Sequence, residues 1–253
     1  MLMGAAFLSQ GAAVSGLLRA DEELNLGVNG FLKYEIQGQT FYLTTTHISI
    51  LFILGMILVF AIIANRAIKK ADPTKEPGMF MNIVDLLVES IDKLTVSNMG
   101  VEYGPRFSNY IGALFMFLFC SNISGLLGLR PPTADYSVTL ALALMTFAII
   151  HFNGFKHQKL KHVTDLFHPL LLTPINIIGE FAVPVSMSLR LFGNIMSGTV
   201  MMTLVYGLIP RVLTLVWPSV LHAYFDLFSG AIQSYVFCML TMVFTKNAIA
   251  GDD

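Results

Sequence analysis

Long apolar stretches without charged residues alternate along this chain with short charged loops. Residues 41–65, 107–129 and 137–155 are mostly apolar, and none of them contains Asp, Glu, Lys or Arg. About 20 consecutive apolar residues are enough to cross the hydrocarbon core of a bilayer. Each of these stretches therefore predicts one membrane-spanning helix, and the charged loops mark where the chain leaves the bilayer.

The last apolar region is too long for two upright spans. It predicts two helical arms, at about 167–207 and about 211–246, and the first arm contains only two charged residues, Glu180 and Arg190. A helix of about 40 residues is roughly 60 Å long, which is twice the thickness of the hydrocarbon core. We therefore expect each arm to be strongly tilted, kinked or partly interfacial, so that the chain ends in a long tilted helical hairpin.

Residues 79–100 show a different pattern, in which apolar and charged positions follow a helical period. Apolar residues recur at a spacing of three or four, and charged residues fall on the other side. The apolar positions are Ile83, Leu86, Leu87, Ile91 and Leu94, and the charged positions are Asp85, Glu89, Asp92 and Lys93. This pattern predicts an amphipathic helix on the membrane surface or against a partner. The predicted fold class is therefore all-α integral membrane, with about five transmembrane helices plus one amphipathic surface helix.

Basic residues in the loops predict how the chain is oriented in the membrane. The loop after the first predicted span contains four Lys or Arg residues between positions 66 and 75, and the loop after the third reads KHQKLKH. Loops rich in Lys and Arg tend to stay in the cytoplasm, so both are placed there. The N-terminal segment, residues 1–40, is then extracytoplasmic, the membrane domain covers residues 41–253, and the C-terminus is cytoplasmic.

The composition agrees with a membrane protein and excludes several other classes. Of the 253 residues, 55% are hydrophobic and 12% are charged, whereas about a quarter of a soluble domain is charged. The net charge of −1 shows no excess of basic residues that would bind phosphate groups, so no nucleic-acid partner is expected. Cys120 and Cys238 lie in apolar runs, which favours buried thiols over a disulfide or a metal site. The sequence contains no motif of the common hydrolases, zinc enzymes or nucleotide-binding loops, and no cofactor is expected.

Three ionisable residues inside the apolar arms are the strongest functional signal. Glu180, Arg190 and Asp226 interrupt sequence that otherwise reads as lipid-buried helix. Such residues are rare in membrane helices and usually face a partner or a water-filled cavity. At about 100° per residue, Arg190 shares a helix face with small and polar side chains. The residues on that face are Ser186, Asn194, Ser197 and Met201.

Two further polar tracks lie on the same hairpin. Asp226 and Gln233 are seven residues apart on the second arm, so regular α-helical winding would place them on one face. His222, one turn earlier, extends this track toward the outer surface. On the first arm, Asn176 and Glu180 are four residues apart and form a third track.

Other interpretations of these residues remain open at this point. Arg190 could form a structural ion pair with Asp226 or Glu180, and Asn194 and Gln233 could be interhelical hydrogen-bonding groups. A secondary transporter with a site around Arg190 and Asp226 would be expected to show internal repeats, and none is visible between the halves. An intramembrane hydrolase would need a nucleophile and a base, and no convincing set is present.

The stretch PINIIGEFAVPVSMSLRLFGNIMSG, residues 174–198, resembles subunit a of the F-type ATP synthase. The later GAIQ, residues 230–233, strengthens the resemblance. The likeness covers nearly the whole chain, from the first span to the last. It implies a stator subunit of the membrane sector, whose final hairpin faces a ring of c subunits.

The resemblance also implies roles for single residues. Arg190 matches the family's essential arginine, Asn194 the asparagine beside it, and Gln233 the glutamine of the final helix. Asp226 stands where other members have histidine or glutamate. Glu180 matches an acidic position of chloroplast-like members. These matches imply that Arg190 acts as an electrostatic gate toward a carboxylate of the c-ring.

One departure from the family pattern affects the expected ion path. Many members have an acidic residue nine positions after the arginine, where this chain has Thr199, so Asp226 would have to supply any inlet carboxylate. Two offset half-channels are implied, one open to the outside and one to the cytoplasm. The residues expected along the ion pathway are Asn194, Asp226, Gln233, Glu180, Asn176, Ser197 and His222.

The resemblance further implies partners and a location. The partners are the c-subunit ring, the b-subunit peripheral stalk, the rest of the ATP synthase complex and the lipid bilayer. The chain would move protons or sodium ions and would catalyse no chemical reaction itself. A multi-pass protein of the plasma (inner) membrane is expected.

Overall fold

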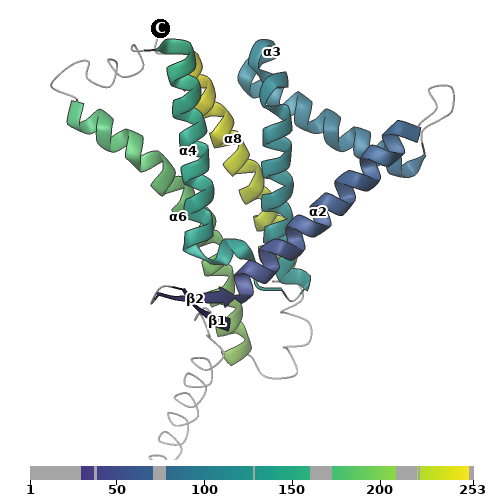
Figure 1. Ribbon diagram of the computed structural model, residues 1–253, viewed down its shortest axis with the longest axis vertical. Helices are drawn as coiled ribbons and strands as arrows, with labels where there is room; N and C mark the ends of the chain where they lie inside the picture. The colour runs from purple at the N-terminus through teal and green to yellow at the C-terminus, as the bar shows by residue number, and fades with distance from the viewer. Residues whose placement is uncertain are drawn as a thin grey trace, which may run out of the picture.

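The computed structural model describes residues 30–36, 39–70, 78–127, 129–159, 173–208, 221 and 223–250. Within these residues, five helices are long and apolar enough to cross a membrane. The main helices are α2 (Thr45–Lys70), α3 (Met79–Ile123), α4 (Tyr136–Gln158), α6 (Thr173–Leu208) and α8 (Gly230–Ala250). The predicted all-α membrane fold is confirmed, and the helices are arranged as a bundle from which α2, α6 and the first part of α3 splay outward (Figure 1).

A β-hairpin precedes the first membrane helix. Strands β1 (Gly30–Ile36) and β2 (Gln39–Thr44) pair antiparallel, with Ile36 opposite Gln39. The first span was predicted at 41–65, but residues 41–44 belong to β2 and the helix runs from Thr45 to Lys70. The sequence QTFYLT is rich in aromatic and β-branched residues, which favour a strand where a partner strand is available.

The predicted surface helix and the second predicted span are two arms of α3. Gly100, with φ 86° and ψ 170°, separates them, and this backbone conformation is nearly restricted to glycine. The second arm continues directly to Ile123, followed by a 3₁₀ turn at Ser124–Leu127, so the span predicted at 107–129 begins earlier and its α-helix ends earlier. A Cβ on Gly104 would lie 2.8 Å from Val96 Cα, which shows how closely the two arms approach around the bend.

A side-chain contact also joins the two arms of α3. The Ser108 hydroxyl donates a hydrogen bond to Oδ1 of Asp92, one of the charged residues of the amphipathic arm. Asp92 is therefore held against the second arm, although the sequence pattern placed it with the outward-facing charged residues. Figure 1 shows the resulting change of direction within α3.

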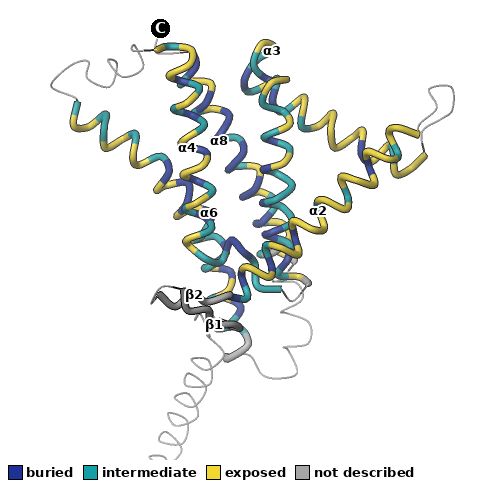
Figure 2. Tube along the Cα trace, in the orientation of Figure 1, coloured by how far each residue is buried: buried dark blue, intermediate teal, exposed yellow. Residues whose placement is uncertain are grey.

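Helix α8 lies at the centre of the bundle, packed against both α3 and α4. Figure 2 shows that it is largely buried, whereas α2 and the first arm of α3 are largely exposed. Phe237, Cys238 and Met242 of α8 are almost completely buried. The core around them takes residues from all the larger helices except α2, among the described residues. These are Met99, Ile111, Leu114, Leu118, Ala143, Met187 and Leu191.

The final hairpin was predicted as two long arms, each strongly tilted, kinked or partly interfacial. Helix α6 has 36 residues, which corresponds to roughly 54 Å, and it runs obliquely across α4 (Figure 1). Its first arm was predicted from about 167, but residues 160–172 lie outside the described part. The second arm was predicted at about 211–246. Its described part begins as a π-helix, Ala223–Ser229, and continues as α8 to Ala250, while residues 209–220 are outside the described part.

Candidate functional site

Arg190 lies on a face of α6 that points away from the bundle. Ser186, Arg190, Gly193 and Ser197 are all exposed, whereas Leu191 of the opposite side is fully buried in the core. A Cβ added to Gly193 would meet no other atom within 4 Å. The predicted face of small and polar residues around the arginine is thus present, and it forms an open surface of this chain.

The described ion pairs do not neutralise Arg190. Among the residues that the structure describes, ion pairs join Lys93 to Glu89, Arg130 to Asp135, and His151 to Glu180. The structural pair of Arg190 with Glu180 is therefore wrong, because the Glu180 carboxylate lies against the ring of His151 instead.

A polar seam joins α6 to the beginning of the last arm. The Ser229 hydroxyl donates to Oδ1 of Asn194 at 2.7 Å, and the Ser197 hydroxyl donates to the carbonyl oxygen of Asn194 at 3.0 Å. The hydrogen-bonding interpretation of Asn194 is thus confirmed. Its Nδ2 and the Nε2 of Gln233 are both buried and have no hydrogen-bond partner among the described residues. Buried donors of this kind are costly, so they favour a seam that takes up water or a partner group.

The π-helix at Ala223–Ser229 changes the geometry expected for Asp226. Seven residues close two turns only where the winding is α-helical throughout, and the i→i+5 pattern of a π-helix has more residues per turn. The premise that placed Asp226 and Gln233 on one face therefore does not hold across this segment. The side chain of Asp226 and the whole of His222 lie outside the described part of the structure.

Asn122 is a buried polar residue that sequence reasoning missed. Its Nδ2 donates to the carbonyl oxygen of Gly230 and to the hydroxyl of Ser234, both at 3.0 Å. Its Oδ1 accepts a hydrogen bond from the Thr133 hydroxyl, also at 3.0 Å. The Asn122 side chain thereby holds the start of α8 at Gly230 and Ser234, the two positions that flank Gln233. The available signal was an amide inside an otherwise apolar span, which commonly marks an interhelical hydrogen bond.

The predicted track of Asn176 and Glu180 lies near the beginning of α6. Both residues are partly buried, and the structure brings Glu180 to a partner on α4 that the sequence did not suggest. Nε2 of His151 lies 3.3 Å from Oε1 of Glu180. The rings of Phe147 and His151 are 4.1 Å apart, and Phe147 also lies beside Phe181 of α6.

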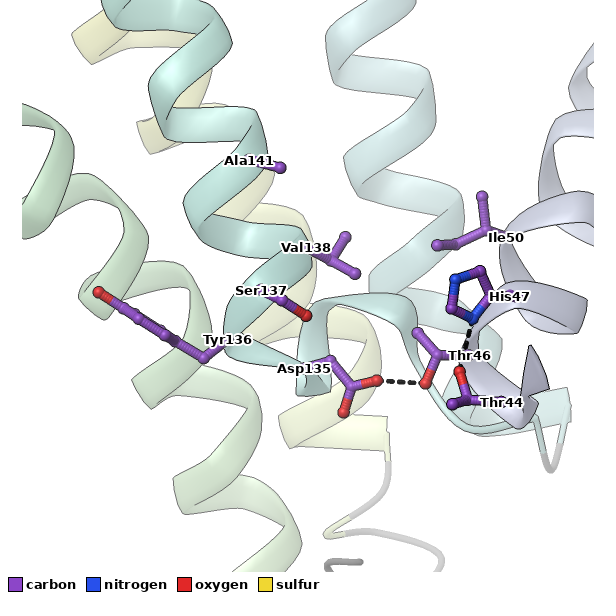
Figure 3. Close-up of a pocket in the computed structure, with 9 residues that line it drawn as sticks. All are labelled: Thr44, Thr46, His47, Ile50, Asp135, Tyr136, Ser137, Val138 and Ala141. Carbon is purple, nitrogen blue, oxygen red and sulfur yellow. Dashed lines mark hydrogen bonds between the residues drawn. The ribbon is translucent and has the colours of Figure 1, made fainter. Parts of the chain in front are cut away.

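A pocket of about 480 Å³ opens at the other end of the bundle, next to the β-hairpin (Figure 3). It lies between the first turns of α2 and α4. The Thr46 hydroxyl donates to Oδ2 of Asp135, whose Oδ1 lies 2.8 Å from the Arg130 guanidinium. Thr44 and His47 are joined by a 2.6 Å hydrogen bond at the edge of the pocket. The pocket walls therefore bring the beginning of α2 and the loop before α4 together.

Comparison with known proteins gives a consistent result. Residues 47–246 match the protein family described as ATP synthase A chain. A protein of Propionigenium modestum named "ATP synthase subunit a, sodium ion specific" is 37% identical, over 84% of this chain and 76% of its own length. The ATP synthase subunit a of Bacillus subtilis is 31% identical, over 88% of this chain and 99% of its own length. That of Mycoplasmoides gallisepticum is 32% identical, over 81% of this chain and 78% of its own.

These matches extend over most of both partners in each comparison, and the family match alone covers the described helices almost completely. They agree with the five membrane-length helices. The chain belongs to the ATP synthase A chain family and is a multi-pass membrane protein with an ion-transport role in the membrane sector of an F-type ATP synthase.

Proposed function

We propose that this chain is the stator subunit that exchanges ions with a rotating ring of c subunits, and that Arg190 is the fixed charge at the point of exchange. The observation that carries this proposal is the open face of α6. Arg190 stands there among Ser186, Gly193 and Ser197, outside every ion pair described above. Small side chains on both sides of a cation leave room for the helix of a neighbouring subunit to approach closely.

The chemistry of the guanidinium explains why this position needs arginine. A ring carboxylate that faces lipid is desolvated, so it is stable in the neutral, protonated form. When it passes Arg190, the nearby positive charge favours the ionised form, and the proton leaves. An arginine guanidinium keeps its own proton in proteins, so it acts as a fixed positive charge. Arg190 therefore discharges each passing site and blocks a direct leak of protons between the two sides.

Two half-channels would carry the ion to and from this point. For the half-channel that opens to the outside we propose Asn194, Asp226 and Gln233, with Ser197 and His222. The buried donors of Asn194 and Gln233 support this choice, because ordered water in the seam would satisfy them. For the cytoplasmic half-channel we propose a second pair, Glu180 and Asn176, which lie together near the beginning of α6.

Neither half-channel crosses the membrane, so an ion must travel on the ring between them. Each charge that moves down 100 mV supplies about 2.3 kcal/mol. Several charges per step can drive synthesis in the soluble head of the complex. The chain itself catalyses no reaction, and it contacts the c-ring and the b-subunit peripheral stalk.

The same proposal includes an orientation in the membrane and a transported ion. Residues 1–40 are extracytoplasmic, residues 41–253 form the membrane domain, and the C-terminus is cytoplasmic in the plasma (inner) membrane. The proton is the proposed ion. The relative from Propionigenium modestum is named as sodium-specific, so sodium is the alternative, and the ring carboxylate that holds the ion decides between the two.

The test is ATP-driven pumping by the complete complex in inverted membrane vesicles. Arg190→Ala and Arg190→Lys are expected to abolish acidification of the vesicle interior while the subunit still assembles with its partners. Arg106→Ala is the matched control, since Arg106 is an exposed arginine on α3, close to Tyr103. Normal acidification by either Arg190 variant would refute the gate. If the unmodified complex took up ²²Na⁺ and did not acidify the vesicles, sodium would replace the proton as the transported ion. The proposed role of Arg190 would be unaffected.

The secondary-transporter alternative makes a different prediction for the same vesicles. It expects solute uptake that is independent of ATP and of the soluble head. No described feature favours this alternative, and the family relationship weighs against it.

A further inference from the structure

The imidazole of His151 is the feature of this structure that the proposed function does not use. It projects from α4 toward α6, and its Nε2 lies 3.3 Å from Oε1 of Glu180. This distance is just beyond the usual range of about 2.7–3.2 Å for an N–H···O hydrogen bond. At this separation the two groups lie close to hydrogen-bond contact.

The surroundings hold the ring in this position. Phe147, one turn earlier on α4, packs edge-to-face against the imidazole with 4.1 Å between ring centroids. Phe147 in turn lies beside Phe181, the residue that follows Glu180. Nε2 of His151 is shielded from solvent, and the side chain as a whole is 19% exposed. Glu180 is more open, with 34% of its side chain exposed, so the pair connects a shielded nitrogen to an accessible carboxylate.

The depth of this pair follows from its position along the two helices. His151 lies seven residues before the end of α4 at Gln158, and Glu180 lies seven residues after the start of α6 at Thr173. At about 1.5 Å per residue, both groups are roughly 10 Å from the same end of the bundle. This is the end where the described part of α8 also finishes, opposite the β-hairpin (Figure 1).

The other titratable groups around His151 do not take the place of Glu180. Helix α4 packs against α6 and α8 and against the 3₁₀ turn Pro132–Ala134, which has no titratable residue. The other described titratable residues on these elements and on α4 itself are Arg190, Tyr235, Cys238, Lys246, Tyr136, Lys156 and His157. The ion pair described for His151 joins it to Glu180.

We propose that His151 is a proton-relay residue of the cytoplasmic half-channel, acting directly on Glu180. Imidazole suits this role because it binds and releases protons near neutral pH. In the transfer, the O–H bond on Oε1 of protonated Glu180 breaks as an N–H bond forms on Nε2 of His151. A carboxylate beside an imidazolium results. The imidazolium then gives the proton on its other nitrogen, Nδ1, to water on the cytoplasmic side, and a proton shift between the two nitrogens restores the starting neutral ring. This inference rests on the proposed function, because it places Glu180 in that half-channel.

The experiment uses the complete ATP synthase in inverted vesicles, where the cytoplasmic face is in contact with the bath. His151→Ala is expected to lower ATP-driven acidification by about tenfold, a modest effect for loss of one acid–base group. Imidazole added to the bath should restore much of this loss. His151→Gln should also flatten the dependence of acidification on bath pH between about pH 6 and 8, the range in which histidine titrates.

His157→Ala is the matched control, on the same helix. Its Nδ1 bonds to the carbonyl oxygen of Asn153 and its ring touches Tyr103, so it lies outside the relay. This variant should keep the pumping rate and gain nothing from imidazole. Subunit content of each purified complex is measured as well. If His151→Ala does not assemble, the larger His151→Gln side chain provides the pH profile.

The outcomes separate the relay from the proposed function. The relay would be overturned if His151→Ala pumped at the full rate and His151→Gln had an unchanged pH profile. If Glu180→Gln lost pumping in the same experiment, Glu180 would remain part of the proposed ion path. Reduced pumping without rescue by imidazole and without a change of pH profile would show a packing role and also overturn the relay. Full pumping by Glu180→Gln would refute the proposed cytoplasmic half-channel through Glu180.

Discussion

Removing the side-chain amide of Asn122 is the perturbation whose effect can be worked out most fully. The residue is 1% exposed and makes three hydrogen bonds, all at 3.0 Å, to Gly230, Ser234 and Thr133. Asn122→Ala deletes all three. The Ser234 hydroxyl still donates to the Gly230 carbonyl in the variant, so these two groups keep each other as partners. The Thr133 hydroxyl, which is fully buried, loses its acceptor.

The magnitude follows from these three bonds. Interhelical hydrogen bonds in membrane proteins contribute about 0.6 kcal/mol each on average, which gives roughly 2 kcal/mol for the set. The buried Thr133 hydroxyl adds a penalty of about 1–3 kcal/mol if nothing replaces its partner. We therefore expect Asn122→Ala to lower the free energy of local opening at the start of α8 by about 3–5 kcal/mol. Since 1.36 kcal/mol corresponds to a tenfold change, amide exchange there should accelerate by about 150- to 5000-fold.

The assay is hydrogen–deuterium exchange of the purified complex, followed at the peptide that contains residues 230–238. Thr133→Val is the matched comparison, because it removes one bond, keeps the shape and leaves the amide of Asn122 bonded to Gly230 and Ser234. It should accelerate exchange far less than Asn122→Ala. Unchanged exchange in Asn122→Ala would refute the reasoning. Equal acceleration in both variants would show that the bond between Asn122 and Thr133 alone carries the effect.

Three glycine substitutions test the packing and backbone conformation of the same structure. Gly230→Ala should destabilise the complex by about 1–3 kcal/mol, because the new Cβ would lie 2.9 Å from Cβ of Asn122. Gly193→Ala should leave the midpoint of thermal unfolding unchanged or raise it, because a Cβ at this position meets nothing within 4 Å. A lower midpoint for Gly193→Ala than for Gly230→Ala would contradict the packing described for α6 and α8. Gly100→Ala should cost about 1–3 kcal/mol, because φ at this position is 86°, and it should expose the bend of α3 to trypsin. Wild-type resistance to trypsin would show that the bend tolerates a side chain.

The membrane helices were predictable because their signal is compositional. In a bilayer every backbone N–H and C=O group must form a hydrogen bond within the segment. A long uncharged stretch that crosses the bilayer is therefore expected to be a helix. Helix α4, which runs from Tyr136 to Gln158, shows this directly, since the uncharged stretch 137–155 predicted it. The hairpin before α2 was missed because residues 41–44, three of them apolar or aromatic, fit the start of a membrane span equally well.

The bend of α3 was not predictable in the same way. Gly100 is one of 20 glycines, and nothing in its neighbours distinguishes it. Its positive φ becomes necessary only because the two arms fold back on each other, with Gly104 against Val96 and Ser108 against Asp92. The π-helix before α8 is similar, because the sequence around Asp226 looks like ordinary helix.

The sequence by itself determined that this chain spans a membrane and that Arg190 lies on a small-residue face of a long helix. Both follow from local rules, the transfer of apolar side chains into lipid and the period of the α-helix. Only the tertiary structure decided which polar groups meet. Asn122 reaches Gly230 over 108 positions, and His151 meets Glu180 across two helices. No local pattern encodes such contacts, because they depend on how helices far apart in the sequence pack side by side.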